Sequence, residues 1–261
     1  MNWLRILTIG GITSYRALFG WTSPWILVPS LLVAPLGQIL LFAYIGRASG
    51  VGSDAFFVIG NAVQYSAMPC LFGATSTVVG ERLQRTLGIL LLSPAPRLAL
   101  LLGRLLPVLL NGVGVALFGY LAGSALLGVP VRVGTLAPVA LAIAAAAFGC
   151  TGLGLINAAI GLRLRDTAVL SNILFGLLLL LSGADVPLDA LPPGLARISG
   201  WLPLTHGLAA ARSLAAGGGL ADAGPALLAE VLLGVGYGVV GVTLLRLLEV
   251  RARSAATLEL A

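Results

Sequence analysis

Long apolar runs without charge restrict the fold of this chain more than any other feature. Of its 261 residues, 59% are hydrophobic and only 9% are charged, and the mean hydropathy is +1.06. A soluble core cannot enclose so much apolar surface. Roughly 20 helical residues cross a hydrocarbon core about 30 Å thick, and several of the runs reach that length. Because these runs lack the alternation of barrel strands, the sequence predicts an all-α integral membrane protein.

Six membrane-spanning helices are predicted from the positions of these runs. They cover residues 25–45, 56–80, 105–127, 135–160, 167–183 and 225–248. The 15 basic residues are all arginines, and eleven of them fall on one side of the spans: Arg5, Arg16, Arg82, Arg85, Arg97, Arg104, Arg163, Arg165, Arg246, Arg251 and Arg253. Since short arginine-rich loops stay in the cytoplasm, both termini are predicted to be cytoplasmic. Arginine without lysine is also typical of a high-GC genome, which favours a bacterial cell membrane.

Three further segments complete a single predicted transmembrane domain over residues 1–261. Residues 1–24 combine apolar residues with two arginines, which predicts a helix lying in the cytoplasmic interface. Residues 184–224 are broken by prolines into pieces too short to span, yet they are too apolar for a solvated loop. They are predicted to form a re-entrant hairpin of short helices in the outer leaflet. Residues 81–104 carry four arginines and one glutamate between two apolar runs, which predicts a cytoplasmic segment.

Two motifs in these segments carry a family resemblance. The first, after the second span, consists of Glu81, Thr86, Leu87, Leu90, Leu91, Ser93, Pro94 and Arg97. The second, after the fifth span, consists of Pro187, Leu188, Leu191, Pro192, Leu202, Pro203, Leu204, Thr205 and Arg212. In this order, on a six-span frame with both ends inside, they resemble the permeases of ABC-2 type transporters. That family includes bacterial permeases that export drugs, polysaccharides and lipids, and the resemblance extends over the whole chain.

The resemblance implies that a cytoplasmic coupling helix docks in a cleft of a separate ATP-binding subunit. The residues assigned to this contact are Glu81, Arg82, Arg85, Thr86, Leu87, Leu90, Ser93, Pro94 and Arg97, with a second contact at Arg163, Arg165 and Asp166. The physical chemistry agrees, because the leucines would share one broad helical face and the dipole favours Glu81 near the helix N-terminus. The simpler alternative is that the arginines only anchor the topology by binding lipid phosphates.

The coupling segment departs from the family pattern at two positions. Arg85 stands where glycine is usual before the threonine, and Gly88 stands where an acidic residue usually follows the leucine. Glu81 is therefore the only negative charge in the segment. We expect a second permease, the same or a homologous chain, and favour a non-identical one that supplies the more typical segment.

No ATPase or metal site is expected within the chain. A P-loop needs a glycine-rich loop that ends in lysine followed by serine or threonine, and this sequence has no lysine. ATP and Mg²⁺ are therefore expected to bind the partner subunit, and the chain is not expected to be an enzyme by itself. His206 is the only histidine, and no further metal ligands stand at suitable spacing around it.

Polar residues within and beside the predicted spans form a candidate substrate path. They are Gln38, Asn61, Gln64, Asp185 and His206. Almost wholly apolar walls suit a hydrophobic or amphipathic substrate, with a drug or natural product as the first expectation and a lipid or lipid-linked glycan as the second. Interhelical hydrogen bonding is the alternative use of the amides.

An ATP-driven exporter is the leading functional prediction, and two alternatives are kept. A secondary transporter would show inverted repeats and charges near the membrane midplane, and neither is evident in the sequence. A membrane scaffold has no contrary chemistry, but it would not explain the cytoplasmic segment or the broken outer hairpin.

Overall fold

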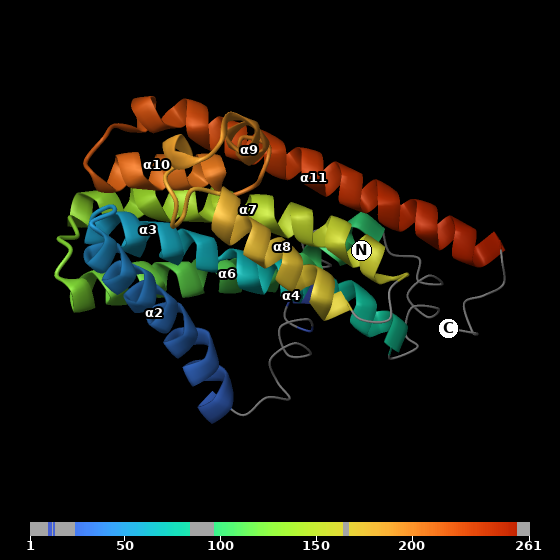
Figure 1. Cartoon of the computed structure of the whole chain (residues 1–261). Coiled ribbons are helices and arrows are strands. Elements are labelled where there is room, and N and C mark those ends of the chain that lie inside the picture. The colour runs from blue at the N-terminus through green and yellow to red at the C-terminus, as the bar shows by residue number, and fades with distance from the viewer. Residues whose placement is uncertain (1–9, 12, 14–23, 84–96, 164–166, 255–261) are drawn as a thin grey trace.

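The computed structural model describes residues 10–11, 13, 24–83, 97–163 and 167–254, and these residues form helices and turns without a strand (Figure 1). The long helices are α2 (Pro24–Ser49), α3 (Asp54–Tyr65), α4 (Ala67–Leu83), α6 (Arg97–Leu127), α7 (Val133–Gly161), α8 (Thr167–Leu181) and α11 (Leu220–Ser254). Between α8 and α11 lie the 3-10 turn η1 (Leu188–Ala190), α9 (Pro193–Ser199) and α10 (Thr205–Ala215). The predicted all-helical fold is thereby confirmed for the described residues.

Five stretches of helix are long and apolar enough to cross a membrane. They are Leu32–Ser49, Asp54–Gly80, Ala99–Leu127, Val133–Gly161 and Leu220–Leu248. The remaining predicted span corresponds to α8, an apolar helix of 15 residues. At about 1.5 Å per residue, α8 alone is shorter than a hydrocarbon core. The described part of the chain is thus a multi-pass helical membrane protein, and the sixth crossing stays a prediction.

The second predicted span is divided into α3 and α4 at Ser66. Pro69 explains the break, because proline has no N–H for the helical bond to Tyr65 and its ring crowds that carbonyl. The Ser66 hydroxyl donates to the Val63 carbonyl at 2.6 Å and ties the break to α3. The third helix also begins earlier than predicted, at Arg97, so the last part of the predicted 81–104 segment is continuous with the α6 span.

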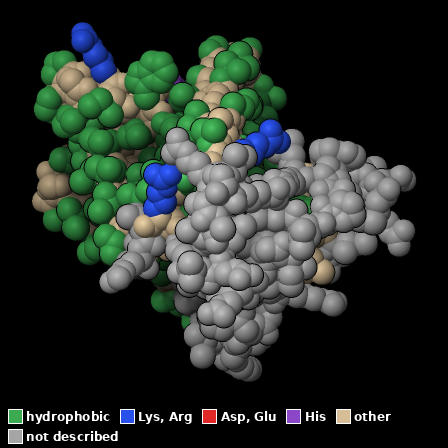
Figure 2. All heavy atoms as spheres, turned by 90° about the vertical axis from the view of Figure 1, so that its right-hand side faces the viewer, with side chains coloured by type: hydrophobic (Ala, Val, Ile, Leu, Met, Phe, Trp, Pro, Cys, Tyr) green, Lys and Arg blue, Asp and Glu red, His purple; other side chains and the backbone are tan. Residues whose placement is uncertain are grey.

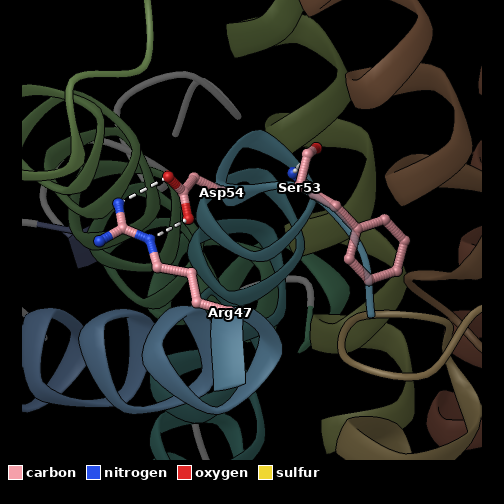
Figure 3. A network of polar contacts seen from close by, with 4 residues as sticks. Arg47, Ser53 and Asp54 are labelled. Atoms are coloured by element: carbon pink, nitrogen blue, oxygen red, sulfur yellow. Dashed lines mark hydrogen bonds and ion pairs between the residues drawn. The ribbon is translucent and has the colours of Figure 1, made fainter. Parts of the chain in front are cut away.

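The turn between α2 and α3 is stabilised by polar contacts at the end of the bundle opposite the C-terminus (Figure 1). The chain turns through Gly50 with a φ of +68°, a conformation that glycine adopts without strain. Ser53 then caps α3, its hydroxyl accepting from the Phe56 N–H at 3.3 Å. Beside it, Arg47 forms a two-point ion pair with Asp54 at 2.7 and 2.8 Å (Figure 3). These contacts fix how α2 and α3 meet.

The helix α7 forms the centre of the bundle. Within an apolar 18-residue window of each span, 72% of the Val133–Gly161 residues are buried, whereas only 17% of the Leu220–Leu248 residues are. Packed against α7 are α4, α6, α10 and α11, while α2 contacts α3 and α6 and leans away from the bundle at its N-terminal end (Figure 1). The exposed apolar side chains on α2 and α11 are those expected for helices that face lipid or another protein.

Candidate functional site

A chain of amide and carboxyl groups links α2, α3 and the segment after α8. The Gln38 amide of α2 donates to Asn61 Oδ1 and to Gln64 Oε1 of α3, each at 2.9 Å. In turn, the Asn61 amide donates to Asp185 Oδ1 at 2.6 Å and to the Phe57 carbonyl at 3.0 Å. Four of the five residues predicted for a substrate path therefore belong to one hydrogen-bond network, which we call the outer polar network after the predicted outer hairpin that contains Asp185.

The outer polar network is partly buried and incompletely satisfied. Asn61 and Gln64 are fully buried, and Gln64 Nε2 and Asp185 Oδ2 have no hydrogen-bond partner among the described residues. Burial raises the pKa of Asp185 to about 6, against the opposing effects of the Asn61 hydrogen bond and the positive charge of Arg212. One free donor and one free acceptor can hydrogen-bond a polar group of a ligand or a water molecule.

Arg212 of α10 fastens the segment after α8 to α3. Its Nη1 donates to the Gly183 carbonyl at 2.8 Å, and its Nη2 donates to the carbonyls of Ala184 at 2.9 Å and Phe56 at 3.2 Å. The guanidinium also lies over the Phe56 ring, 3.7 Å from its centroid, in cation–π geometry. A Cβ at Gly60 would overlap the Ala184 carbonyl, so glycine permits this close approach.

Glu230 of α11 caps the N-terminus of α10 inside the bundle. Its two carboxylate oxygens accept from the backbone N–H groups of Leu204 at 2.7 Å and Gly207 at 2.8 Å. Glu230 is fully buried, and Leu204 has a φ of +85°, which is strained for a residue with a branched side chain. The carboxylate satisfies N–H groups that a helix start leaves free, and it holds the strained residue in place.

This capping role was missed in the sequence, where Glu230 stands out only as the single acidic residue within an apolar run. An acid in a membrane-spanning segment generally marks a buried partner or a functional group. The partner could not be named, because the sequence does not place the start of α10 beside α11.

His206, the fifth residue predicted for the path, lies apart from the outer polar network. Its Nε2 is 3.0 Å from the Gly200 carbonyl, within its own hairpin. Among the described residues, no group of three or more His, Cys, Asp and Glu side chains could hold a metal ion. His206 thus lies in the first turn of α10, and its ring contacts the C-cap residue of α9.

Most of the residues predicted to contact an ATP-binding subunit fall outside the described part of the chain. Those outside it are Arg85, Thr86, Leu87, Leu90, Ser93, Pro94, Arg165 and Asp166. Glu81 and Arg82 lie in the last turn of α4, and Arg97 is the first residue of α6, with only the backbone described for all three. Arg163 follows α7 with an exposed side chain. The predicted interfacial helix over residues 1–24 also lies almost wholly outside the described residues.

The helix ends that flank these predicted contacts lie at one end of the bundle. Gly161, the last residue of α7, lies close to the start of α8 and to the end of α4. A Cβ added to it would be 2.7 Å from Thr167 Cγ2 and 3.4 Å from Val79 Cγ2. The C-terminal end of α11 is at the same end of the bundle (Figure 1). Seen from that end, the visible described side chains are mostly hydrophobic, with arginines beside the undescribed residues and no acidic group in view (Figure 2).

An all-helical bundle with several apolar helices of membrane length defines a multi-pass membrane protein. The family model for the ABC-2 type transporter matches residues 16–215, from before α2 to the end of α10. The chain therefore belongs to the ABC-2 type transporter family and is a transmembrane permease component of an ABC transporter. Membership implies association with an ABC ATP-binding subunit. No match was found among curated proteins.

Proposed function

We propose that the chain is the permease subunit of an ATP-driven exporter in a bacterial cytoplasmic membrane. The observation that carries the proposal is the ABC-2 type family match over residues 16–215. The absence of lysine from the sequence supports a division of labour, because the lysine of a P-loop must then come from another polypeptide. ATP and Mg²⁺ bind that partner, and the assembled complex hydrolyses ATP while this chain supplies the path. The arginine distribution supports a cytoplasmic position for both termini.

The ATP-binding subunit contacts the end of the bundle where α4 ends and α6 and α8 begin. Glu81 and Arg82 in α4, Arg97 in α6 and Arg163 after α7 stand at or beside these helix ends, as the predicted coupling contacts require. ATP-driven closure of two ATP-binding subunits pushes on this end and shifts the helices against a second permease. The departures at Arg85 and Gly88 favour a non-identical second permease that supplies the missing acidic residue.

The outer polar network supports a substrate path between α2 and the α3 helix. Gln38, Asn61, Gln64 and Asp185 are the polar groups that lie together among apolar helices there. A hydrophobic or amphipathic substrate with a few hydrogen-bonding groups matches this lining. We therefore propose a drug or natural product as the substrate, and a lipid or lipid-linked glycan as the second choice.

The coupling role of Glu81 is tested in the complex of the chain with its ATP-binding subunit. Glu81→Ala is expected to lower transport and stimulated ATP hydrolysis by at least tenfold, while membrane insertion persists. Glu249→Ala is the matched control, since Glu249 is also an acidic residue near the cytoplasmic end of a spanning helix. Unchanged transport in the Glu81→Ala complex would overturn the coupling role, and an equal loss in both variants would show that it is not specific to Glu81.

A further inference from the structure

A second buried polar cluster joins three helices toward the other end of the bundle. Asn157 of α7 donates from Nδ2 to Thr75 Oγ1 of α4 at 2.8 Å and to Ser171 Oγ of α8 at 2.7 Å. All three residues are buried, with exposed fractions of 0% for Asn157, 3% for Thr75 and 1% for Ser171. One side chain of the central helix thus bonds to both neighbouring helices at once.

Every polar hydrogen of this cluster has an acceptor, whereas Asn157 Oδ1 is buried without a partner among the described residues. The Thr75 hydroxyl donates its hydrogen to the Leu71 carbonyl at 2.8 Å, and the Ser171 hydroxyl donates to the Thr167 carbonyl at 3.1 Å. Each hydroxyl oxygen is therefore free to accept one N–H of the Asn157 amide. Removing the amide would cost the two bonds between helices, but it would leave neither hydroxyl hydrogen without an acceptor.

Two glycines beside Asn157 allow the three helices to approach closely. A Cβ on Gly154 would lie 2.7 Å from the Cys70 carbonyl of α4, and a Cβ on Gly161 would lie 2.7 Å from Thr167 Cγ2 of α8. On a helix, residues 154, 157 and 161 share one face. Small residues around a central amide are a recurrent way to lock membrane helices together.

The cluster adjoins the two segments that the proposed function assigns to the ATP-binding subunit. Thr75 lies about two turns before Leu83, where α4 ends beside the predicted coupling segment. Ser171 lies about one turn after Thr167, where α8 begins after the predicted second contact. The cluster is therefore a buried polar link between helices that lies within about two turns of either segment.

We propose that Asn157 is a positioning residue that clamps the inner ends of α4 and α8 to α7, so that these helices move as one unit when the ATP-binding subunits close. The proposal rests on the proposed function, because it assigns a mechanical role to a contact between helices that such closure would load. Because of the clamp, the two predicted contacts with the ATP-binding subunit act on one rigid body and not on two independent helices.

Distance measurements by electron paramagnetic resonance test the clamp in the full complex with its ATP-binding subunit. One spin-label pair is Ser76→Cys in α4 with Val169→Cys in α8, and the other is Val33→Cys in α2 with Val169→Cys. All three positions are exposed, whereas Cys70 and Cys150 are fully buried. The labelled chain is diluted with unlabelled chain, and a sample without added cysteines measures background labelling.

ATP with vanadate is expected to change the distance from Val33 to Val169 but not the distance from Ser76 to Val169. In the Asn157→Leu variant, the distance from Ser76 to Val169 is expected to change or broaden with nucleotide, while the complex still assembles. Asn172→Leu is the matched control, because the Asn172 amide of α8 donates only to Ala168 of its own helix and is exposed. That control is expected to behave like the unmodified chain.

The remaining outcomes separate the two proposals. A nucleotide-dependent change between Ser76 and Val169 in the unmodified chain, or an Asn157→Leu complex that matches it, would overturn the clamp and leave the proposed function standing. No response to nucleotide in either label pair would overturn the proposed ATP-driven movement and, with it, the clamp.

Discussion

The carboxyl groups of Glu230 and Asp185 differ in how many of their oxygens accept hydrogen bonds. Glu230 accepts two backbone N–H groups, one on each oxygen, so its charge is compensated at the start of α10. Asp185 accepts one amide hydrogen on Oδ1, and its Oδ2 has no partner among the described residues. A fully bonded carboxylate suits a structural role, whereas a half-bonded one leaves an acceptor for another molecule.

At the residue scale, Glu230→Gln tests the capping role. Glutamine can accept one of the two backbone N–H groups, but it turns an NH₂ donor toward the other, so one buried N–H loses its acceptor. The expected loss of folding free energy is about 1–3 kcal/mol, measured as a lower thermal unfolding temperature of the purified chain. Asp222→Asn is the control, because exposed Asp222 accepts only the Gly219 N–H at 3.2 Å. Equal losses in the two variants would contradict the account.

At the element scale, the contact between α3 and the segment after α8 was the hardest to foresee. The apolar runs predicted the helices well, because their length alone separates spans from loops. Asn61 and Asp185 are 124 residues apart, and no local pattern predicts which amide meets which acid over such a separation. The break at Ser66 was missed for a different reason. The apolar run over residues 56–80 predicts one helix by its length, although the effect of Pro69 on the preceding turn is local and predictable.

The contact of Asp185 with Asn61 predicts that the stability of the chain depends on pH. Asp185 lies outside the membrane-spanning helices, and burial raises its pKa from 3.8 to about 6. A raised carboxyl pKa means that the folded chain binds the proton more tightly than the unfolded chain does. The stabilisation from this group is therefore complete below pH 3.8 and is lost as the pH rises through about 6. The other charged group that faces Asp185 is Arg212, which opposes part of the shift.

Asp185→Asn replaces the acid by a neutral group of the same shape and should remove this dependence. Near pH 4 the variant is expected to unfold at the same temperature as the unmodified chain. Near pH 7 it is expected to be more stable, by a few degrees in Tm. Thermal unfolding across this pH range measures the difference. If the Tm of the two proteins changed with pH in parallel, Asp185 would not titrate as described.

At the scale of the whole molecule, side-chain amides link helices in two clusters separated along the bundle. The outer polar network joins α2 and α3 to the segment after α8, and the Asn157 cluster joins α4, α7 and α8 toward the end where the predicted contacts lie. The apolar window of α7 is as buried as that of α3 and α4, and α7 packs against α4, α6, α10 and α11. Under the proposed function, a push at one end would be passed through packed helices to the other.

The sequence predicted the polar lining of the candidate site better than its connections. Gln38, Asn61 and Gln64 were recognisable because amides are conspicuous in apolar helices. Arg212 was recognised as part of a family motif, but its bonds to three carbonyl groups depend on how α10 folds back against α3. Such contacts arise from tertiary packing, which composition and spacing do not encode.

The most direct test of the central claim is reconstitution of the chain in proteoliposomes with the ATP-binding protein that copurifies with it. The account predicts that the chain alone hydrolyses no ATP, that the complex hydrolyses ATP with Mg²⁺, and that this hydrolysis moves an amphipathic fluorescent drug across the membrane. ATP hydrolysis by the purified chain alone, or movement of the drug that persists without ATP and follows an imposed ion gradient, would contradict it.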